Sequence, residues 1–186
     1  MGGVSSLFHV PDDEAAIAKE LEVILSQFDL ILLSGGVSKG KYDFIPQSLE
    51  ALGIKKLFHQ VSQKPGKPMW FGRSSTKFVF ALPGNPVSTF MCFHKYVKPW
   101  LLASLGASFK TQKAILAADY SFKAPLTYFL QVRLINEEGK WMAYPITGRG
   151  SGDFVNLKDV DGFLELPKGQ NHFRFGESYS CFQFRI

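Results

Sequence analysis

The chain has 186 residues, of which 46% are apolar and 20% charged, a composition typical of folded globular proteins and unlike that of disordered chains. The net charge of +5 favours anionic ligands but does not distinguish nucleic acid from a small phosphorylated molecule. The sequence shows neither an apolar run near the roughly 18 residues that span a bilayer nor a signal-peptide pattern, and two cysteines, Cys92 and Cys181, suit a reducing, cytoplasmic compartment.

Strand and helix patterns alternate over the first hundred residues. We expect strands at 4–10, 28–33, 54–61, 69–71 and 78–82, and helices beginning after Asp12 or Asp13, at residue 44 and at Pro86. Residues 28–33 (FDLILL) form a nearly pure apolar run, as in a strand that is buried on both faces. The alternation predicts an α/β arrangement, with a parallel sheet flanked by helices.

The pattern changes near Gly106. Short strands are expected at 114–116, 128–134, 140–145, 163–166 and 179–184, separated by turn signals. They predict a small all-β domain, either a partly closed barrel or a sandwich. We therefore place two domains at residues 1–105 and 110–186. A doubly wound sheet usually begins with a strand and a phosphate-facing loop, so this α/β domain is expected to lack its first strand.

The segment 34–40 (SGGVSKG) follows the most apolar predicted strand, at the edge where open α/β sheets bind ligands. Gly35 and Gly36 permit positive φ angles and let backbone N–H groups point at an anion. Hydroxyl and ammonium groups come from Ser34, Ser38 and Lys39. The alternative is a tight turn that binds nothing, and a short Gly-Gly loop does not decide between the two.

Three aspartates lie near the starts of predicted helices. Asp43 lies three residues after Gly40, and Asp12 and Asp13 lie between the first strand and the first helix. Asp is a common helix N-cap. The functional alternative is a carboxylate that binds Mg²⁺ or orients a water beside the anion loop. Spacing alone favours the cap.

The segment 64–68 (KPGKP) is a rigid basic turn, because two prolines fix φ and Gly66 supplies the turn. It presents Lys64 and Lys67, which suits phosphate or oxyanion binding. The alternative is a solvated basic turn without a ligand.

The segment 83–88 (PGNPVS) follows an apolar strand and begins a helix. Asn85 is a good N-cap and Pro86 a good first helical residue. A helix begun in this way points free N–H groups at the ligand edge of the sheet. The alternative is ordinary helix initiation.

Together, the motifs at 34–43, 64–68 and 82–88 resemble those of the molybdopterin molybdenumtransferase (MoeA) family, which includes the E-domain of gephyrin. Their order and spacing agree, and the combination is far more specific than any one motif. The resemblance extends over almost the whole chain, including residues 161–169 (DGFLELPKG). It implies a three-layer α/β/α, MogA-like molybdopterin-binding domain followed by a small barrel-like β domain.

The resemblance also implies an activity in molybdenum cofactor biosynthesis: insertion of molybdate into adenylated molybdopterin with Mg²⁺, releasing AMP. Asp43 corresponds to an acidic residue needed for activity, which acts through Mg²⁺ or in cleaving the adenylate. Asp12 corresponds to a second acidic position, and Lys64 to a basic residue near the oxyanion. Residues implied to contact nucleotide, pterin phosphate or oxyanion are Ser34, Gly35, Gly36, Ser38, Lys39, Lys67, Pro83, Gly84, Asn85, Pro86 and, near a neighbouring subunit's site, Ser151.

Two departures from the family pattern stand out. Gln60 occupies the place of a second basic residue four positions before Lys64, which implies weaker anion binding unless Lys39 or His59 substitutes. The family's N-terminal domains and the first strand of its α/β domain have no counterpart here. We therefore expect a C-terminal fragment of a homodimeric enzyme, weakly active or inactive alone.

Two other functions remain as alternatives: a non-catalytic scaffold of the gephyrin type, and a MogA- or CinA-like nucleotide-binding domain. The β pattern after Gly106 argues against the latter. The expected partners are small anionic substrates, a second copy of the full-length protein and proteins that handle the molybdenum cofactor. Nucleic acid is not expected, because the lysines lie on separate loops without a basic-aromatic stripe, and neither is a membrane.

Overall fold

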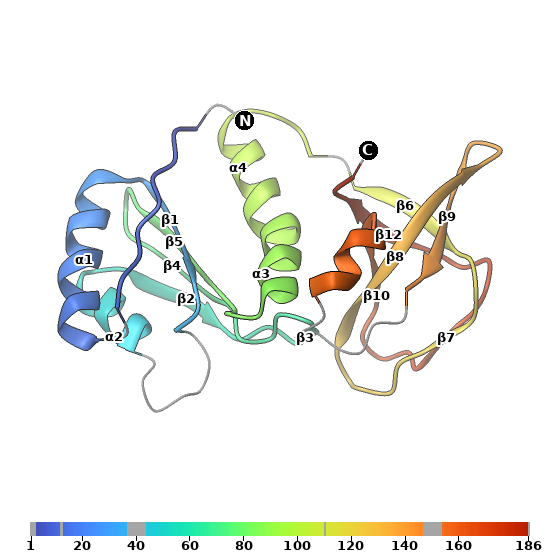
Figure 1. Ribbon diagram of the computed structural model, residues 1–186, viewed down its shortest axis with the longest axis horizontal. Helices are drawn as coiled ribbons and strands as arrows, with labels where there is room; N and C mark the ends of the chain where they lie inside the picture. The colour runs from blue at the N-terminus through green and yellow to red at the C-terminus, as the bar shows by residue number, and fades with distance from the viewer. Residues whose placement is uncertain (1–2, 12, 37–43, 110, 147–153, 186) are drawn as a thin grey trace. The chain divides into compact units, whose positions relative to one another are not determined.

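The computed structural model describes residues 3–11, 13–36, 44–109, 111–146 and 154–185 (Figure 1). The chain forms two compact units, one of Met1–Val61 with Pro68–Gly84, the other of Ser62–Lys67 with Asn85–Ile186. It therefore passes from one unit to the other after residues 61, 67 and 84. Compactness alone does not decide a domain boundary, so the expected division at 1–105 and 110–186 stays a prediction.

The first unit contains a four-stranded mixed sheet in the order β1-β5-β4-β2. Its strands are β1 (Leu30–Ser34), β5 (Phe78–Leu82), β4 (Trp70–Arg73) and β2 (Lys55–His59). Only β1 and β5 run parallel, and β4 is antiparallel to both β5 and β2. The expectation of a parallel sheet was therefore wrong for two of its three strand pairings. A tight turn after β4 reverses the chain, so that β4 and β5 form a hairpin.

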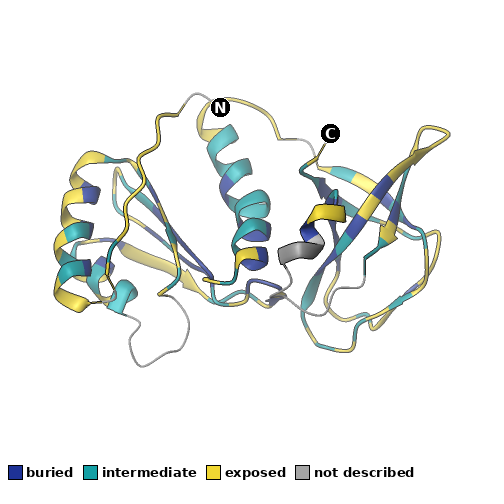
Figure 2. Cartoon of the chain, in the orientation of Figure 1, coloured by how far each residue is buried: buried dark blue, intermediate teal, exposed yellow. Residues whose placement is uncertain are grey.

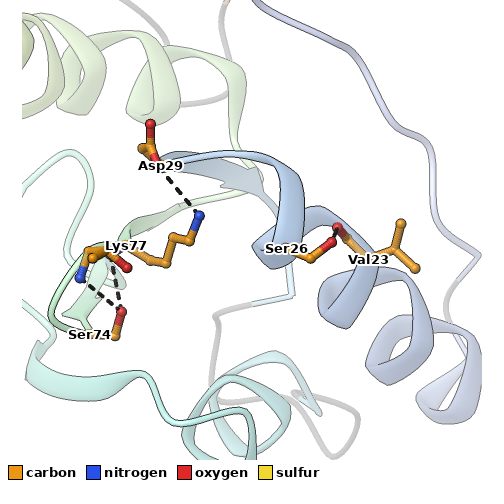
Figure 3. Close-up of polar contacts among 6 residues, drawn as sticks. Val23, Ser26, Asp29, Ser74 and Lys77 are labelled. Carbon is orange, nitrogen blue, oxygen red and sulfur yellow. Dashed lines mark hydrogen bonds and ion pairs between the residues drawn. The ribbon is translucent and has the colours of Figure 1, made fainter.

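The turn of this hairpin is held by one serine and an ion pair. The Ser74 hydroxyl accepts from the backbone N–H of Lys77 at 3.1 Å, and the Ser74 N–H donates to the Lys77 carbonyl. The Lys77 Nζ lies 3.4 Å from Asp29 Oδ1, just before β1 (Figure 3). The backbone of Asp29 accepts from the Phe78 N–H at 2.8 Å. These contacts fix the start of β5 beside the start of β1.

Two helices, α1 (Glu14–Gln27) and α2 (Phe44–Ala51), cover one face of this sheet (Figure 1). As predicted, an aspartate caps α1: the Asp13 Oδ1 accepts from the Ala16 N–H at 2.9 Å. The buried side chains that form this core are Ile17, Leu21, Ile24, Leu25, Ile31, Leu49, Ile54, Trp70, Val79 and Ala81.

Two expectations for the start of the chain were wrong. Residues 3–10 are extended but form no strand, and Val4 and Leu7 are 97% and 99% exposed. Backbone groups form a ladder only with a partner, and among the described residues β1 pairs with β5 alone. Because it has only this one partner among the described residues, β1 is an edge strand. It is also not buried on both faces, since Leu32 is 43% exposed. An apolar run alone does not distinguish a central strand from an edge strand.

The second unit is built on a closed barrel, so of the two predicted alternatives, a partly closed barrel and a sandwich, the barrel is the one that forms. Its strands are β6 (Gln112–Leu116), β8 (Thr127–Glu137), β9 (Lys140–Pro145), β10 (Gly162–Leu166) and β12 (Ser178–Gln183). They pair in the order β10-β12-β6-β9-β8, and β8 pairs back with β10. A two-residue strand, β3 (Gln63–Lys64), runs parallel to β8. Figure 2 shows β8 changing from buried to exposed toward its hairpin with β9.

Smaller elements complete the barrel. Strands β7 (Tyr120–Ser121) and β11 (His172–Phe173) pair with each other, and a 3₁₀ helix, η2, covers Phe154–Asp159. The buried side chains inside are Ala114, Leu116, Leu130, Val132, Leu134, Ala143, Leu164, Leu166, Phe173 and Cys181.

The helix predicted to begin at Pro86 is confirmed, and it continues to Ser104 in three parts. These are α3 (Pro86–Cys92), a π-helical turn (Phe93–Val97) and α4 (Lys98–Ser104). The Lys98 N–H donates to the Phe93 carbonyl, five residues back. Pro99 follows directly, and a proline ring clashes with the carbonyl four residues earlier. The wider turn before Pro99 relieves that clash.

Candidate functional site

In the first unit, two glycine-containing loops leave neighbouring parallel strands side by side. Ser34 and Leu82 are paired at the ends of β1 and β5. The Gly35 N–H donates to the Leu82 carbonyl at 3.2 Å, and a Cβ on Gly84 would lie 3.4 Å from the Gly35 Cα. These loops lie at the carboxyl edge of two parallel strands, where α/β sheets bind ligands.

Both glycines after β1 have positive φ, 95° at Gly35 and 66° at Gly36. A Cβ on Gly36 would come within 2.4 Å of Ile45 Cδ1, at the start of α2, whereas one on Gly35 would meet nothing within 4 Å. The first glycine therefore leaves open space above the strand end, and the second lets the backbone turn closely against α2. This is the backbone geometry that the sequence predicted for an anion-facing loop.

The loop after β5 continues into α3 as predicted. The Asn85 side chain accepts from the Ser88 N–H at 3.1 Å and from the Ser88 hydroxyl at 3.2 Å. Pro86 is the first helical residue. The N-cap role of Asn85 is confirmed, and ligand contacts by residues 83–86 stay a prediction.

Residues 64–68, here called the lysine turn, belong to the second unit up to Lys67, and they expose their two lysines and bury the two residues between them. Lys64 and Lys67 are exposed, whereas Pro65 and Gly66 are buried. Gly66 has φ 85°, and a Cβ there would lie 2.5 Å from the Cys92 Sγ of α3. The backbone that carries the two lysines is therefore packed tightly on α3. A rigid turn that presents both lysines is what the sequence predicted.

The lysine turn is anchored by a buried glutamine that the sequence analysis missed. Gln63 is 1% exposed, and its Nε2 donates to the Gly66 carbonyl at 3.2 Å and lies 3.6 Å from Cys92 Sγ. Its Oε1 accepts from the Tyr96 hydroxyl in the π-helical turn. The only sequence signal is a polar residue directly before the first lysine.

An aromatic stack lies next to Lys64. Its Nζ is 5.8 Å from the ring centre of Phe122. Phe122 stacks on Tyr128, with ring centres 4.3 Å apart, and Tyr128 stacks on Tyr120. A cation over an aromatic face is weakly attracted to it, which favours one orientation of the ammonium group.

Burial shifts the titration of several groups near the lysine turn. It raises the pKa of the Cys92 thiol to about 12, although the Gln63 amide opposes this shift. Burial also raises the pKa of Tyr96, with Cys92 and Glu165 adding to the effect. Both groups are therefore neutral at physiological pH, and the positive charge of the turn comes from its lysines.

Gln60, the departure from the family pattern, has an unusual backbone. Its φ is 74°, which is uncommon for a residue other than glycine, and its N–H donates to the Met69 carbonyl at 2.8 Å. Gln60 therefore directs the chain out of β2, just before it enters the other unit. Lys39, one of the two residues that could supply the missing positive charge, lies outside the described residues.

Several predicted site residues lie outside the described residues. They are Asp12, Ser38, Lys39, Asp43 and Ser151. Among the residues that are described, no group of three His, Cys, Asp or Glu side chains is placed to bind a metal ion. The structure therefore brings together Gly35, Gly36 and Gly84 in the first unit, and Lys64 and Lys67 with Gln63 in the second.

Comparison with known proteins gives two family matches. Residues 2–103 match the model of a probable molybdopterin binding domain, and residues 113–183 match the MoeA C-terminal region, domain IV. The chain belongs to the MoeA family. The resemblance seen in the three loop motifs is thereby confirmed, as is the fold of a MogA-like domain followed by a β domain.

Individual members of the MoeA family are similar to this chain over most of its length. The molybdopterin molybdenumtransferase of Synechocystis sp. is 40% identical over 96% of this chain and 44% of its own length. That of Bacillus subtilis is 30% identical over 94% of this chain and 40% of its own length. The crystal structure of a MoeA protein from Pyrococcus horikosii matches 95% of this chain and 42% of its own, with 31% identity and a TM-score of 0.74. The chain thus spans less than half the length of these relatives.

In the part of the chain that the structure describes, no helix is long and apolar enough to cross a membrane.

Proposed function

We propose that this chain is the part of a molybdopterin molybdenumtransferase that binds its anionic substrates, adenylated molybdopterin and molybdate. The observation that carries the proposal is the close approach of Gly84 to Gly35, at the shared carboxyl edge of β1 and β5. In a chain whose first hundred residues match a molybdopterin-binding domain, this edge is the expected place for the ligand.

In the proposed reaction, molybdate enters the dithiolene of adenylated molybdopterin and AMP leaves. The glycine loop 34–36 would hold the nucleotide or pterin phosphate through backbone N–H groups, with hydroxyls from Ser34 and Ser38 and charge from Lys39. The loop 83–86 would shape the pocket wall. Ser151 would approach the site of a neighbouring subunit. Open space at Gly35 and close packing at Gly36 support this role for the glycine loop.

The lysine turn would contact the oxyanion. Lys64 is proposed as the catalytic cation and Lys67 as a second binding group. Two exposed ammonium groups on a buried, anchored backbone support this role, because an anion gains most from charges that need no rearrangement. With a glutamine at position 60, these two lysines carry more of the binding than they do in relatives with a further basic residue.

Mg²⁺ is proposed through Asp43, with Asp12 as a second acidic residue of the reaction. Carboxylate oxygens are the ligands that Mg²⁺ prefers. Among the described residues, no group of three His, Cys, Asp or Glu side chains adds to such a site. When bound, the ion would neutralise charge on the departing AMP. Function as a homodimer in the cytoplasm, with proteins that handle the molybdenum cofactor as partners, belongs to the same proposal.

Calorimetric titration of the chain with AMP plus Mg²⁺, and separately with molybdate, tests the proposal. Asp43→Ala is expected to weaken AMP binding, and Lys64→Ala to weaken molybdate binding, each by about 10-fold, as loss of one charged contact allows. Lys19→Ala removes an exposed lysine from α1 and is the matched charge control, with no expected change.

The outcomes separate the two halves of the proposal. Absence of AMP binding by the unaltered chain would contradict an intact nucleotide site on the glycine edge. Equal molybdate binding by Lys64→Ala and Lys19→Ala would contradict the oxyanion role of the lysine turn.

A further inference from the structure

Gln63 is buried at a position where a hydrophobic side chain would lose less desolvation free energy than an amide does. It is 1% exposed and lies beside Cys92 on α3, where an unpaired amide would cost desolvation energy. Both ends of its amide are satisfied, by the Gly66 carbonyl and by the Tyr96 hydroxyl. The amide thus connects two segments that are 30 residues apart in the sequence.

The backbone around Gln63 is held on the barrel as well. Gln63 and Lys64 form β3 and pair with Thr127 and Tyr128 of β8. The Thr127 N–H donates to the Ser62 carbonyl at 3.0 Å. The side chain of Gln63 therefore extends from a fixed strand and fastens the turn that follows that strand.

The two ends of this anchor lie directly next to the two lysines. Gln63 precedes Lys64, and Gly66, whose carbonyl Gln63 binds, precedes Lys67. Fixing the peptide groups before both lysines fixes the directions in which their side chains leave the backbone. A loose Gly66 would let the turn reorient and separate the two charges from a shared anion.

We propose that Gln63 is a positioning residue that, together with Tyr96, sets the lysine turn for oxyanion binding. This inference rests on the proposed function of that turn. In this proposal Gln63 does not contact the substrate. It acts through its hydrogen bond to the Gly66 carbonyl, which fixes where Lys64 and Lys67 lie.

The first test is a double-mutant cycle, with molybdate as the titrated probe. Gln63→Met keeps the volume of the side chain and removes both hydrogen bonds. We expect it to raise the Kd for molybdate about 5- to 10-fold in the unaltered chain, but only about 2- to 3-fold in the Lys64→Ala background, because Lys67 is then the one charge of the turn that remains to be positioned. Gln112→Met makes the same substitution in β6 and is expected to leave the Kd unchanged.

Tyr96→Phe is the milder second variant, in case Gln63→Met does not fold. It removes one hydroxyl and leaves the glutamine in place, so we expect a smaller rise in Kd, about 2- to 3-fold. This rise should likewise become smaller in the Lys64→Ala background. Equal effects of Gln63→Met with and without Lys64 would indicate a purely structural residue and overturn the proposal.

A second measurement does not depend on the ligand. Nuclear magnetic relaxation of the Gly66 and Lys67 amides should give order parameters of about 0.85 in the unaltered chain and of less than about 0.6 in Gln63→Met. If molybdate does not bind but these values fall, the proposed function of the turn is wrong while the anchoring role of Gln63 stands. If molybdate binding depends on Lys64 but the order parameters do not change, the inference about Gln63 is wrong while the proposed function stands.

Discussion

Lys95 and Glu165 form an ion pair, with 2.5 Å between Nζ and Oε2, that connects the π-helical turn to strand β10. Both side chains are more than two-thirds buried, and the Lys95 Nζ lies 5.6 Å from the ring centre of Phe129 on β8. The helical segment is therefore fastened to the barrel by a polar contact as well as by packing.

Removing one partner of this pair should destabilise the chain. We expect Lys95→Met to lower the free energy of unfolding by about 1–2 kcal/mol, because Glu165 would keep a partly buried, unpaired charge. The double variant Lys95→Met/Glu165→Leu should recover part of the loss. Urea denaturation followed by circular dichroism measures both. Lys56→Met breaks the exposed pair with Glu50 and should change stability by less than about 0.5 kcal/mol. If Lys56→Met lost as much unfolding free energy as Lys95→Met, the stabilising role of the Lys95–Glu165 pair would be contradicted.

Gly72 in β4 should not tolerate a side chain. A Cβ there would lie 2.3 Å from the Trp70 ring and 2.9 Å from the backbone oxygen of Lys55. Trp70 is fully buried, and a backbone oxygen has little freedom to move. We expect Gly72→Ala to cost about 1–3 kcal/mol of unfolding free energy, by overpacking. Gly3→Ala, where a Cβ meets nothing, is the control, and similar urea midpoints for the two variants would refute the prediction.

Stability should fall in mild acid because of His94. Burial, with Lys98 as a smaller cause, lowers the pKa of His94 from 6.5 to about 4. Since the folded pKa lies below the unfolded one, the stabilisation is complete above pH 6.5 and is lost as the pH falls from 6.5 toward 4. Allowing for solvent screening of this half-buried ring, the loss should be about 1–2 kcal/mol.

Urea denaturation at pH 7.5 and 4.5 measures this slope. In His94→Gln the contribution of this residue should vanish, whereas in His172→Gln, which alters an exposed histidine, it should persist. An unchanged slope in His94→Gln would assign the acid sensitivity to other groups.

Both cysteines should resist alkylation while the chain is folded. Burial raises the pKa of Cys92 and of Cys181 to about 12. The thiolate fraction at pH 8 is then on the order of 10³ lower than for an unperturbed thiol, in addition to the steric protection. Iodoacetamide followed by mass spectrometry should label neither residue in buffer and both in urea. Rapid labelling of Cys92 in buffer would show that the lysine turn opens readily.

Gly84 should accept a methyl group but no branched side chain. A Cβ at that position makes ordinary contact with the Gly35 Cα at 3.4 Å, so Gly84→Ala should fold and bind AMP almost normally. Gly84→Val adds two methyl groups next to the Gly35 backbone, so AMP affinity should fall by about 10-fold or more as the two loops separate. Calorimetric titration of the two variants with AMP measures this difference. Equal AMP affinities would contradict nucleotide binding at this edge of the sheet.

The sequence predicted best where one local pattern decides the structure. Strands β5 and β9 match their expected bounds, because alternation and flanking turns define them. Asp13 and Asn85 cap helices as predicted, since an N-cap depends on residues within one turn. The positive φ angles at Gly35, Gly36 and Gly66 follow from the same local logic.

Features that depend on distant partners were not predictable in this way. Residues 4–10 and 28–33 have strand-like composition, but the position of a strand in a sheet depends on what pairs with it. Gln63 becomes an anchor only because the fold brings Cys92 and Tyr96 to it. The roles of Asp12 and Asp43 stay predictions, since they lie outside the described residues.

The route of the chain constrains how such a protein can be taken apart. Because residues 62–67 leave the first compact unit, pair with β8 and return, the two units share three covalent junctions. A single recombination event cannot exchange one unit for another of similar fold, since each exchange would leave β3 behind. An exchange that keeps the lysine turn together with the barrel that supports it therefore needs more than one crossover.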